Sequence, residues 1–172
     1  MLERLWSAWR PTYVTSDAPT RRVEAESGAG SVFTQILRSG EPDDATHIVH
    51  RGESTFAILN IHPYGPGHTL VLPYREVADL ADLTADETAA LWATVSDAVG
   101  AVRAAFAPDG LNVGLNLGRP AGGSVPTHLH VHVVPRWTGD SNFMAVIGNT
   151  QTLPMGLEES AAKLRAHWPP PS

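Results

Sequence analysis

Apolar residues along the chain gather in short runs whose composition is typical of strands. Runs rich in β-branched residues and bounded by turn residues predict strands over residues 47–51, 54–60, 68–72, 111–117 and 129–134. Gly52-Glu53 separates the first two runs as a hairpin turn would. We therefore expect neighbouring strands to pair antiparallel in one sheet.

Two longer segments have the apolar spacing of helices. Thr84-Ala-Asp-Glu87 has the form of a capping box, and an apolar stripe follows it from Leu91 to Phe106. Pro108-Asp109-Gly110 is expected to end this long helix. A second stripe, from Leu157 to Trp168, predicts a closing helix.

The chain before Ser31 differs from the rest. Residues 14–30 mix charges with Ser, Ala, Gly and Pro, so we expect an N-terminal extension, partly mobile, over residues 1–30. A single domain should follow over residues 31–172, opening with a short helix that Ser31 caps and Gly40 closes. The expected apolar face of that helix is Phe33, Ile36 and Leu37. Together the elements predict an α+β fold: an antiparallel sheet of about five strands with one long helix and a C-terminal helix, the helices on one side.

Composition narrows the function. The chain has 172 residues, 42% hydrophobic and 17% charged, which fits one soluble domain. It has no cysteine, which excludes disulfides, thiolate metal sites and a cysteine nucleophile. Neither a membrane-spanning run nor a secretory leader is evident, so we expect a cytoplasmic protein without a membrane partner. The net charge of −6 offers no footprint for nucleic acid.

Three of the eight histidines, His128, His130 and His132, occupy alternate positions in the segment 128–134, which includes the last predicted strand. On a strand, a period of two places the three imidazoles on one face and the intervening aliphatic residues on the other. Three imidazoles in register are improbable on a plain solvated face. A functional site is therefore favoured.

Two chemistries fit such a row of imidazoles. Neutral imidazoles bind zinc, but a site of this kind usually needs a ligand from another strand and carboxylate partners, and none is evident. A neutral imidazole is also a good nucleophile toward phosphorus, and a covalent intermediate divides one difficult displacement into two easier ones. Flanking imidazoles can orient the nucleophile, stabilise charge on phosphoryl oxygens and protonate the leaving group. Nucleophilic catalysis is favoured, and the central His130 is flanked on both sides.

The sequence HLHVHVV at residues 128–134 resembles the signature of the histidine triad (HIT) family of nucleotide hydrolases and transferases. Two further blocks are similar to that family: Asn60 to His68, and the loop from Asn116 to Ser124 that precedes the triad. The resemblance runs from about Phe56 to Trp168 and implies the HIT-like fold.

The resemblance also implies roles for the histidines. His130 would be the nucleophile that takes up a nucleotidyl group at its α-phosphorus. His128 and His132 would bind and polarise the phosphates. His68, at the end of a Pro-Gly-His turn, would reach toward the triad. No residue is expected to bind a metal.

Five further residues match positions that hold substrate in the family: Asn60 at the ribose, Asn116, Gly123 and Ser124 at phosphate, and Trp137 at the border of the site. Each also has a simpler interpretation. Gly123 would sit in a turn, although free N–H groups in such a turn bind anions. The two asparagines would bond their own backbone, and Trp137 would pack in the core or at a subunit interface.

Within the family, the segment from Val133 to Phe143 and the opening block from Leu5 to Tyr13 are most similar to the diadenosine tetraphosphate (Ap4A) phosphorylases of actinobacteria. This implies conversion of Ap4A and inorganic phosphate to ATP and ADP through a nucleotidyl-histidine. No cofactor should be required, although a divalent cation such as Mg²⁺ on the polyphosphate would be compatible with the reaction. The resemblance also implies a homodimer or higher homo-oligomer.

Other functions stay open at this stage. Water as the acceptor would make the protein a hydrolase of dinucleoside polyphosphates, and nucleoside phosphoramidates are alternative substrates of the same triad. A function of another class is a nucleotide-binding module without turnover. Loss of turnover with retained nucleotide affinity on replacing His130 would separate the enzyme from the module.

Overall fold

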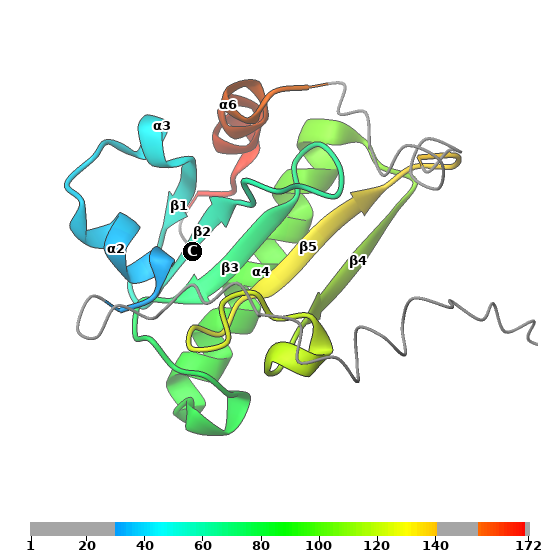
Figure 1. Cartoon of the computed structure of the whole chain (residues 1–172). Helices are drawn as coiled ribbons and strands as arrows, with labels where there is room; N and C mark the ends of the chain where they lie inside the picture. Colours follow the sequence, from blue (N-terminus) through cyan, green and yellow to red (C-terminus); the bar gives the residue numbers. More distant parts are fainter. Residues whose placement is uncertain (1–29, 141–154, 171–172) are drawn as a thin grey trace, which may run out of the picture.

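The computed structural model describes residues 30–140 and 155–170, so nearly all of the expected N-terminal extension over residues 1–30 lies outside the described residues. Within them the chain forms one five-stranded antiparallel sheet in the order β1-β2-β3-β5-β4 (Figure 1). The strands are β1 (Ile48–Arg51), β2 (Thr55–Leu59), β3 (Thr69–Pro73), β4 (Gly110–Leu115) and β5 (Val131–Arg136). The α+β class predicted from the sequence is confirmed.

The helices agree with the predicted stripes. They are α2 (Val32–Arg38), α3 (Asp43–Thr46), α4 (Ala85–Phe106) and α6 (Leu157–His167), with 3₁₀ turns at Leu80–Asp82 and Arg119–Ala121. The capping box of α4 is confirmed, because the Thr84 side chain accepts from the Glu87 N–H and the Glu87 carboxylate accepts from the Thr84 N–H. Ser31 caps α2 by accepting from the Thr34 N–H. The short α3 and both 3₁₀ turns were not predicted.

An apolar cluster packs on each face of the sheet. Helices α4 and α6 cover one face, where Leu91, Val102 and Leu164 pack with Leu59 and Val133. The opposite face carries a second cluster around Phe33 of α2, formed with Phe56, Ile58, Leu70 and Leu72. All residues of β2 and β3 are buried because both faces of these strands are covered.

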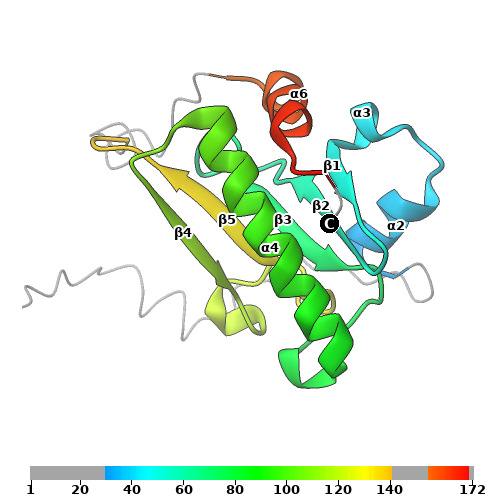
Figure 2. The same cartoon turned by 180° about the vertical axis from the view of Figure 1, so that it is seen from behind.

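The expectation that all helices lie on one side of the sheet is therefore wrong for α2. Figures 1 and 2 show α4 behind the sheet in one view and in front of it in the other. Helix α2 covers only the β1–β3 half of the other face. Over β5 and β4, no helix of the described residues covers that face, and the outer strand β4 is largely exposed (Figure 1).

Among the described residues, no helix is long and apolar enough to cross a membrane.

Candidate active site

The three histidines of the motif lie where β5 begins. The strand starts at Val131, so only His132 belongs to it, and the expected placement of all three on one strand is wrong. The reason is that Leu129 donates its N–H to the Val77 carbonyl, outside the sheet. The rings still gather, since the His130 and His132 ring centroids are 4.9 Å apart.

His130 is held in a single tautomer by the backbone carbonyl of His128. Its Nδ1 lies 2.8 Å from the His128 carbonyl, and a carbonyl oxygen only accepts, so Nδ1 carries the proton in the neutral ring. The Nε2 atom then presents an unprotonated lone pair, with no hydrogen bond to any described residue. Phe33 lies against the ring at 5.5 Å between centroids. The arrangement presents a nucleophilic nitrogen at a fixed position.

His128 is fully buried, and both of its ring nitrogens are bonded to protein. Its Nε2 donates to the Pro73 carbonyl at 2.8 Å, and its Nδ1 accepts from the Ser31 hydroxyl at 2.7 Å. Burial is the main reason that the pKa of His128 lies below its ordinary value. With both nitrogens occupied, this ring can position the backbone that holds His130, and it offers no atom for direct contact with phosphate.

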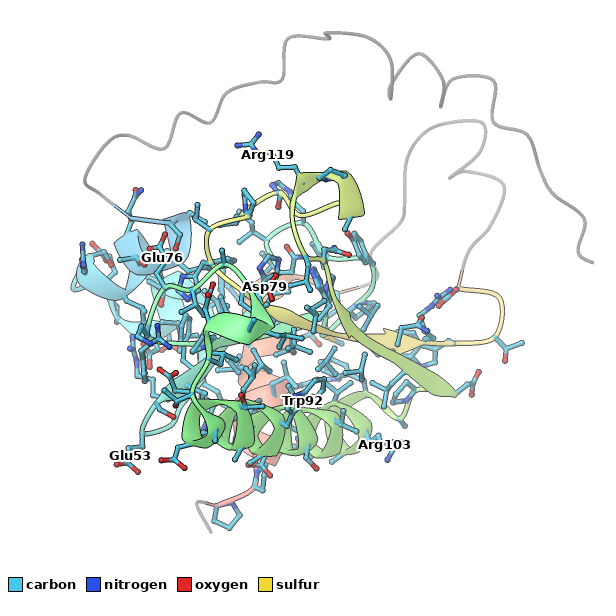
Figure 3. The ribbon with its side chains drawn as sticks, turned by 90° about the horizontal axis from the view of Figure 1, so that it is seen from below. Glu53, Glu76, Asp79, Trp92, Arg103 and Arg119 are labelled. Carbon is cyan, nitrogen blue, oxygen red and sulfur yellow. The ribbon has the colours of Figure 1, made fainter. Side chains whose placement is uncertain are left out.

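Glu76 extends this network onto α2. Its carboxylate accepts from the Ser31 N–H at 2.8 Å and from the Thr34 hydroxyl at 2.6 Å. Burial opposes the ionised form, but hydrogen bonds from Thr34, Ser31 and Thr127 outweigh it, and the pKa of Glu76 is lowered. Figure 3 shows Glu76 beside α2. The start of α2 is thereby fixed to the loop that carries the triad.

His68 and His132 form a second chain of hydrogen bonds. The Tyr64 N–H donates to His68 Nδ1 at 3.1 Å, so the neutral His68 carries its proton on Nε2. That Nε2 donates to His132 Nδ1 at 2.9 Å. His132 must then carry its own proton on Nε2, a buried atom without a partner in the described structure. The chain delivers an unpaired N–H donor beside His130.

Burial keeps both of these rings neutral. It lowers the pKa of His68 to about 3, with further lowering from the nearby His132 and His130. It lowers the pKa of His132 to about 4, again helped by His130. The tautomers inferred from the hydrogen bonds are therefore those that exist at neutral pH.

The Pro-Gly-His turn that carries His68 depends on Gly67. This residue has φ +75°, and a Cβ atom there would lie 2.3 Å from Phe106 Cε2. A side chain at this position would displace the turn from the end of α4. The sequence prediction that His68 reaches toward the triad agrees with the observed bond to His132.

The side chain of Asn60 bonds the nearby backbone, as the simpler interpretation of this residue predicted. Its Oδ1 accepts from the His62 N–H at 2.9 Å, and its Nδ2 lies 3.5 Å from His68 Nδ1. The side chain is half-buried. It therefore shapes the loop after β2 at the edge of the site.

The glycine loop before the triad closes on itself. Gly122 donates its N–H to Arg119, and Gly123 donates to Gly118 at 3.3 Å. The free N–H cradle considered from the sequence is thus not formed by these two glycines in this structure. Ser124 is exposed.

An open groove of about 520 Å³ lies over the uncovered half of the sheet. Asn116 and His132 line it together with Tyr64, whose ring centroid is 6.3 Å from that of His132. Trp137 is half-buried and is not among the residues that line this groove. Its ring lies beside Gly65, where a Cβ atom would be 3.7 Å from Trp137 Cζ3. The groove connects the triad with open solvent.

Within the described ranges, no group of three or more acidic or histidine side chains is arranged to hold a metal ion. The imidazoles are instead bonded to one another and to the backbone.

Three residues of this arrangement were missed by the sequence reasoning. Ser31 was recognised only as a helix cap, whereas its hydroxyl also bonds His128. Glu76 had no signal in its own neighbourhood, because its partners Thr34 and Ser31 lie 42 and 45 residues earlier in the chain. Tyr64 acts through its backbone N–H, which bonds His68 four residues later within a turn. The Pro-Tyr-Gly-Pro spacing could have drawn attention to Tyr64 as part of the turn before His68.

Comparisons with known proteins agree with this geometry. The HIT domain model matches residues 41–139. The AP-4-A phosphorylase of Mycobacterium tuberculosis H37Rv is 43% identical over 97% of this chain and 85% of its own length. The asymmetrical bis(5'-nucleosyl)-tetraphosphatase of Schizosaccharomyces pombe is 36% identical over 55% of this chain and 52% of its own.

Among solved structures, a zinc-bound histidine triad family protein from Mycobacterium smegmatis superposes with a TM-score of 0.65. It is 33% identical and covers 80% of this chain and 92% of its own. The chain belongs to the histidine triad family, whose domain spans the strands, the long helix and the histidine cluster described above.

Proposed function

We propose that the protein is a dinucleoside polyphosphate phosphorylase that converts Ap4A and inorganic phosphate to ATP and ADP. The observation that carries the proposal is the tautomer of His130, whose Nδ1 is bonded to the His128 carbonyl while the Nε2 lone pair accepts no hydrogen bond from the described residues. The 43% identity to the M. tuberculosis AP-4-A phosphorylase supports this choice of substrate and acceptor.

The reaction consists of two displacements at one phosphorus atom. His130 Nε2 attacks the α-phosphorus of Ap4A, the new N–P bond forms, and the bond to the bridging oxygen breaks to release ATP. A phosphate oxygen then attacks the nucleotidyl-histidine, breaks the N–P bond and yields ADP. The buried His132 N–H is directed by its bond to His68 and stabilises charge on the departing oxygen.

In this proposal the remaining predicted residues bind and position substrate. Asn116 contacts phosphate from the groove wall, and Ser124 contacts the leaving group or the incoming acceptor from the exposed loop. Asn60 binds the ribose, and Trp137 borders the site. Gly123 gives the loop its turn, and His128 positions His130 through the backbone.

The identity of the acceptor is tested by product analysis with labelled inorganic phosphate. Label in ADP, with turnover that requires phosphate, is the expected result. AMP formed equally well without phosphate would mean that water is the acceptor and that the protein is a hydrolase. No turnover of Ap4A in either condition would direct attention to phosphoramidates and then to a binding module.

The proposal includes no resident metal. Turnover should persist in excess EDTA, because His130 and His132 supply the nucleophile and the charge-stabilising donor themselves. Stimulation by added Mg²⁺ that follows the polyphosphate concentration would place the ion on the substrate. Complete loss in EDTA, restored by a stoichiometric metal, would contradict this part of the proposal.

We further propose a homodimer in the cytoplasm, where the nucleotide substrates are found. The outer strand β4 leaves one backbone edge open, and Val113 on it is 43% exposed. Trp92 on α4 is also 43% exposed. Sedimentation equilibrium measures the oligomeric state, and a monomer at micromolar concentration would contradict the dimer.

A further inference from the structure

The groove over β5 and β4 runs from the reacting histidines to an arginine. His132, Val134 and Arg136 alternate on β5 and line the groove. The β4 residues opposite His132 and Val134 are Gly114 and Asn112, which form its floor. At about 3.3 Å per residue, Arg136 lies about 13 Å along the strand from His132, which is enough for a short phosphate chain.

The floor of the groove is open above the glycine. A Cβ atom at Gly114 would meet no heavy atom within 4 Å. The opposite direction from His130 is closed, because Phe33 of α2 packs on its ring at 5.5 Å. A group that leaves the phosphorus beside His132 therefore has this groove as its exit.

At the far end of the groove lies the guanidinium group of Arg136, which has N–H groups that the described residues do not bind. Arg136 donates from Nε and Nη2 to the Asp140 carboxylate at 2.6 and 2.9 Å, and from Nη1 to Asn112 Oδ1 at 3.0 Å. These bonds use three of the five N–H groups of an arginine. The side chain is 48% exposed. Its planar fork is fixed in place and suits the oxygens of a phosphate group.

We propose that this groove binds the leaving nucleotide, with Arg136 as the ligand of a phosphate group distant from the reacting phosphorus. The inference rests on the proposed function and adds to it a site for the half of the dinucleotide that is not transferred to His130. Asp140 holds the fork in position but also cancels part of its charge. An anionic phosphate chain would bind the two remaining N–H groups of Arg136, while the neighbouring Asp140 carboxylate repels it.

Two substrates that share the transferred adenylyl group test this site. Ap4A has a long anionic leaving group, whereas adenosine 5'-phosphoramidate has a small one that does not reach Arg136. Arg136→Ala should raise the KM for Ap4A about tenfold and leave kcat/KM for the phosphoramidate unchanged. Arg103→Ala, which removes the same charge from exposed α4 (Figure 3), should change neither substrate.

Asp140→Asn distinguishes ligand binding from a structural role of the pair. The amide still accepts from the Trp137 N–H, as the carboxylate does at 3.2 Å, but no longer neutralises Arg136. The KM for Ap4A should fall in this variant, opposite to the effect of Arg136→Ala. An increase in both variants, or equal losses with both substrates, would overturn the proposal because it would show that the pair only holds the turn.

Binding to a non-reacting chain keeps the inference separate from the proposed function. In a His130→Asn background, Arg136→Ala should weaken Ap4A about tenfold and AMP by less than twofold, measured by calorimetry. Unchanged Ap4A affinity would overturn the groove proposal even if the wild-type chain is a phosphorylase. Absence of turnover in the wild-type chain, with this difference intact, would overturn only the proposed reaction.

Discussion

One face of the sheet packs against α4, and the two halves of the other face differ in what covers them and in their side chains. Over β1 to β3, helix α2 seals the face with Phe33, and Ser31 at its start bonds His128. Over β5 and β4, the same face is open and carries polar groups, among them Asn112 and Arg136. The covered half has few degrees of freedom and fixes atoms in place, whereas the open half leaves room for a ligand.

The reacting histidines lie at the border between these halves. His130 touches Phe33 on the covered side, and His132 lines the groove on the open side. A nucleophile needs a fixed tautomer and position, and a leaving group needs an exit. One uncovered pair of strands therefore provides the exit, while the remaining sheet supplies rigidity.

The greatest loss of activity is expected from replacing His130, which lies at the border itself. His130→Asn should lower kcat by about 10⁴-fold or more, because among the described residues of the triad only His130 has an imidazole lone pair that accepts no hydrogen bond. The affinity for AMP should change by less than about twofold, since the pocket walls stay in place. Steady-state kinetics and calorimetry measure the two quantities, and a parallel loss of both would favour a binding module over an enzyme.

The covered half should respond strongly to a cavity. Phe33→Ala removes a buried ring from the cluster on β2 and β3 and should lower the free energy of unfolding by about 3 to 4 kcal/mol. Its neighbour Val32 on the same helix is 46% exposed, so Val32→Ala should cost less than about 0.5 kcal/mol. Urea denaturation measures both, and similar losses would show that α2 does not seal this face.

Because His68 is buried in its neutral form, the free energy of unfolding should fall as the pH is lowered. Its pKa in the folded chain is about 3, below the ordinary value of 6.5, so the unfolded chain binds the proton first. Stability is unaffected above that ordinary value and declines as the pH falls through it toward the folded pKa. At about pH 5 the loss from this residue is about 2 kcal/mol.

Urea denaturation at about pH 7.5 and about pH 5 measures this decline. The His68→Asn variant is the matched chain, because it lacks the titrating ring but keeps a polar side chain at the same place. Its stability should decline less between the two pH values than that of the wild type. An equal decline in both chains would assign the pH dependence to other groups.

A smaller change is expected at the hydrogen bond between Ser31 and His128, which joins the two halves. Ser31→Ala removes the hydroxyl that caps α2 and donates to His128, and should lower stability by about 1 kcal/mol and kcat by about tenfold. Thr84→Ala removes a cap of the same kind from α4 and should lower stability without changing kcat. Ser31→Thr keeps a hydroxyl and should retain the kcat of the wild type. If Ser31→Ala and the wild type have equal kinetics, Ser31 does not help to position the histidines.

Local sequence patterns were sufficient to predict helices α2, α4 and α6, the strands and the identity of the reactive groups. The capping box at Thr84 and the stripe that follows it give α4, because both depend on contacts between residues three or four apart. Short apolar runs give the five strands, with ends that shift by a few residues. The spacing of His128, His130 and His132, together with the blocks at Asn60 and Asn116, indicated the family, its fold and its chemistry.

The proton positions on the histidine rings and the uncovered face of the sheet depend on how the whole chain packs. The tautomer of His130 depends on a carbonyl two residues earlier, which an ideal strand would have directed elsewhere. His128 is locked by Ser31 and Pro73, and Arg136 meets Asn112 across two strands. The contacts of His128 and Arg136 join residues between 24 and 97 positions apart, and the local sequence pattern carries no information about them because they form only when the sheet and its helices have packed.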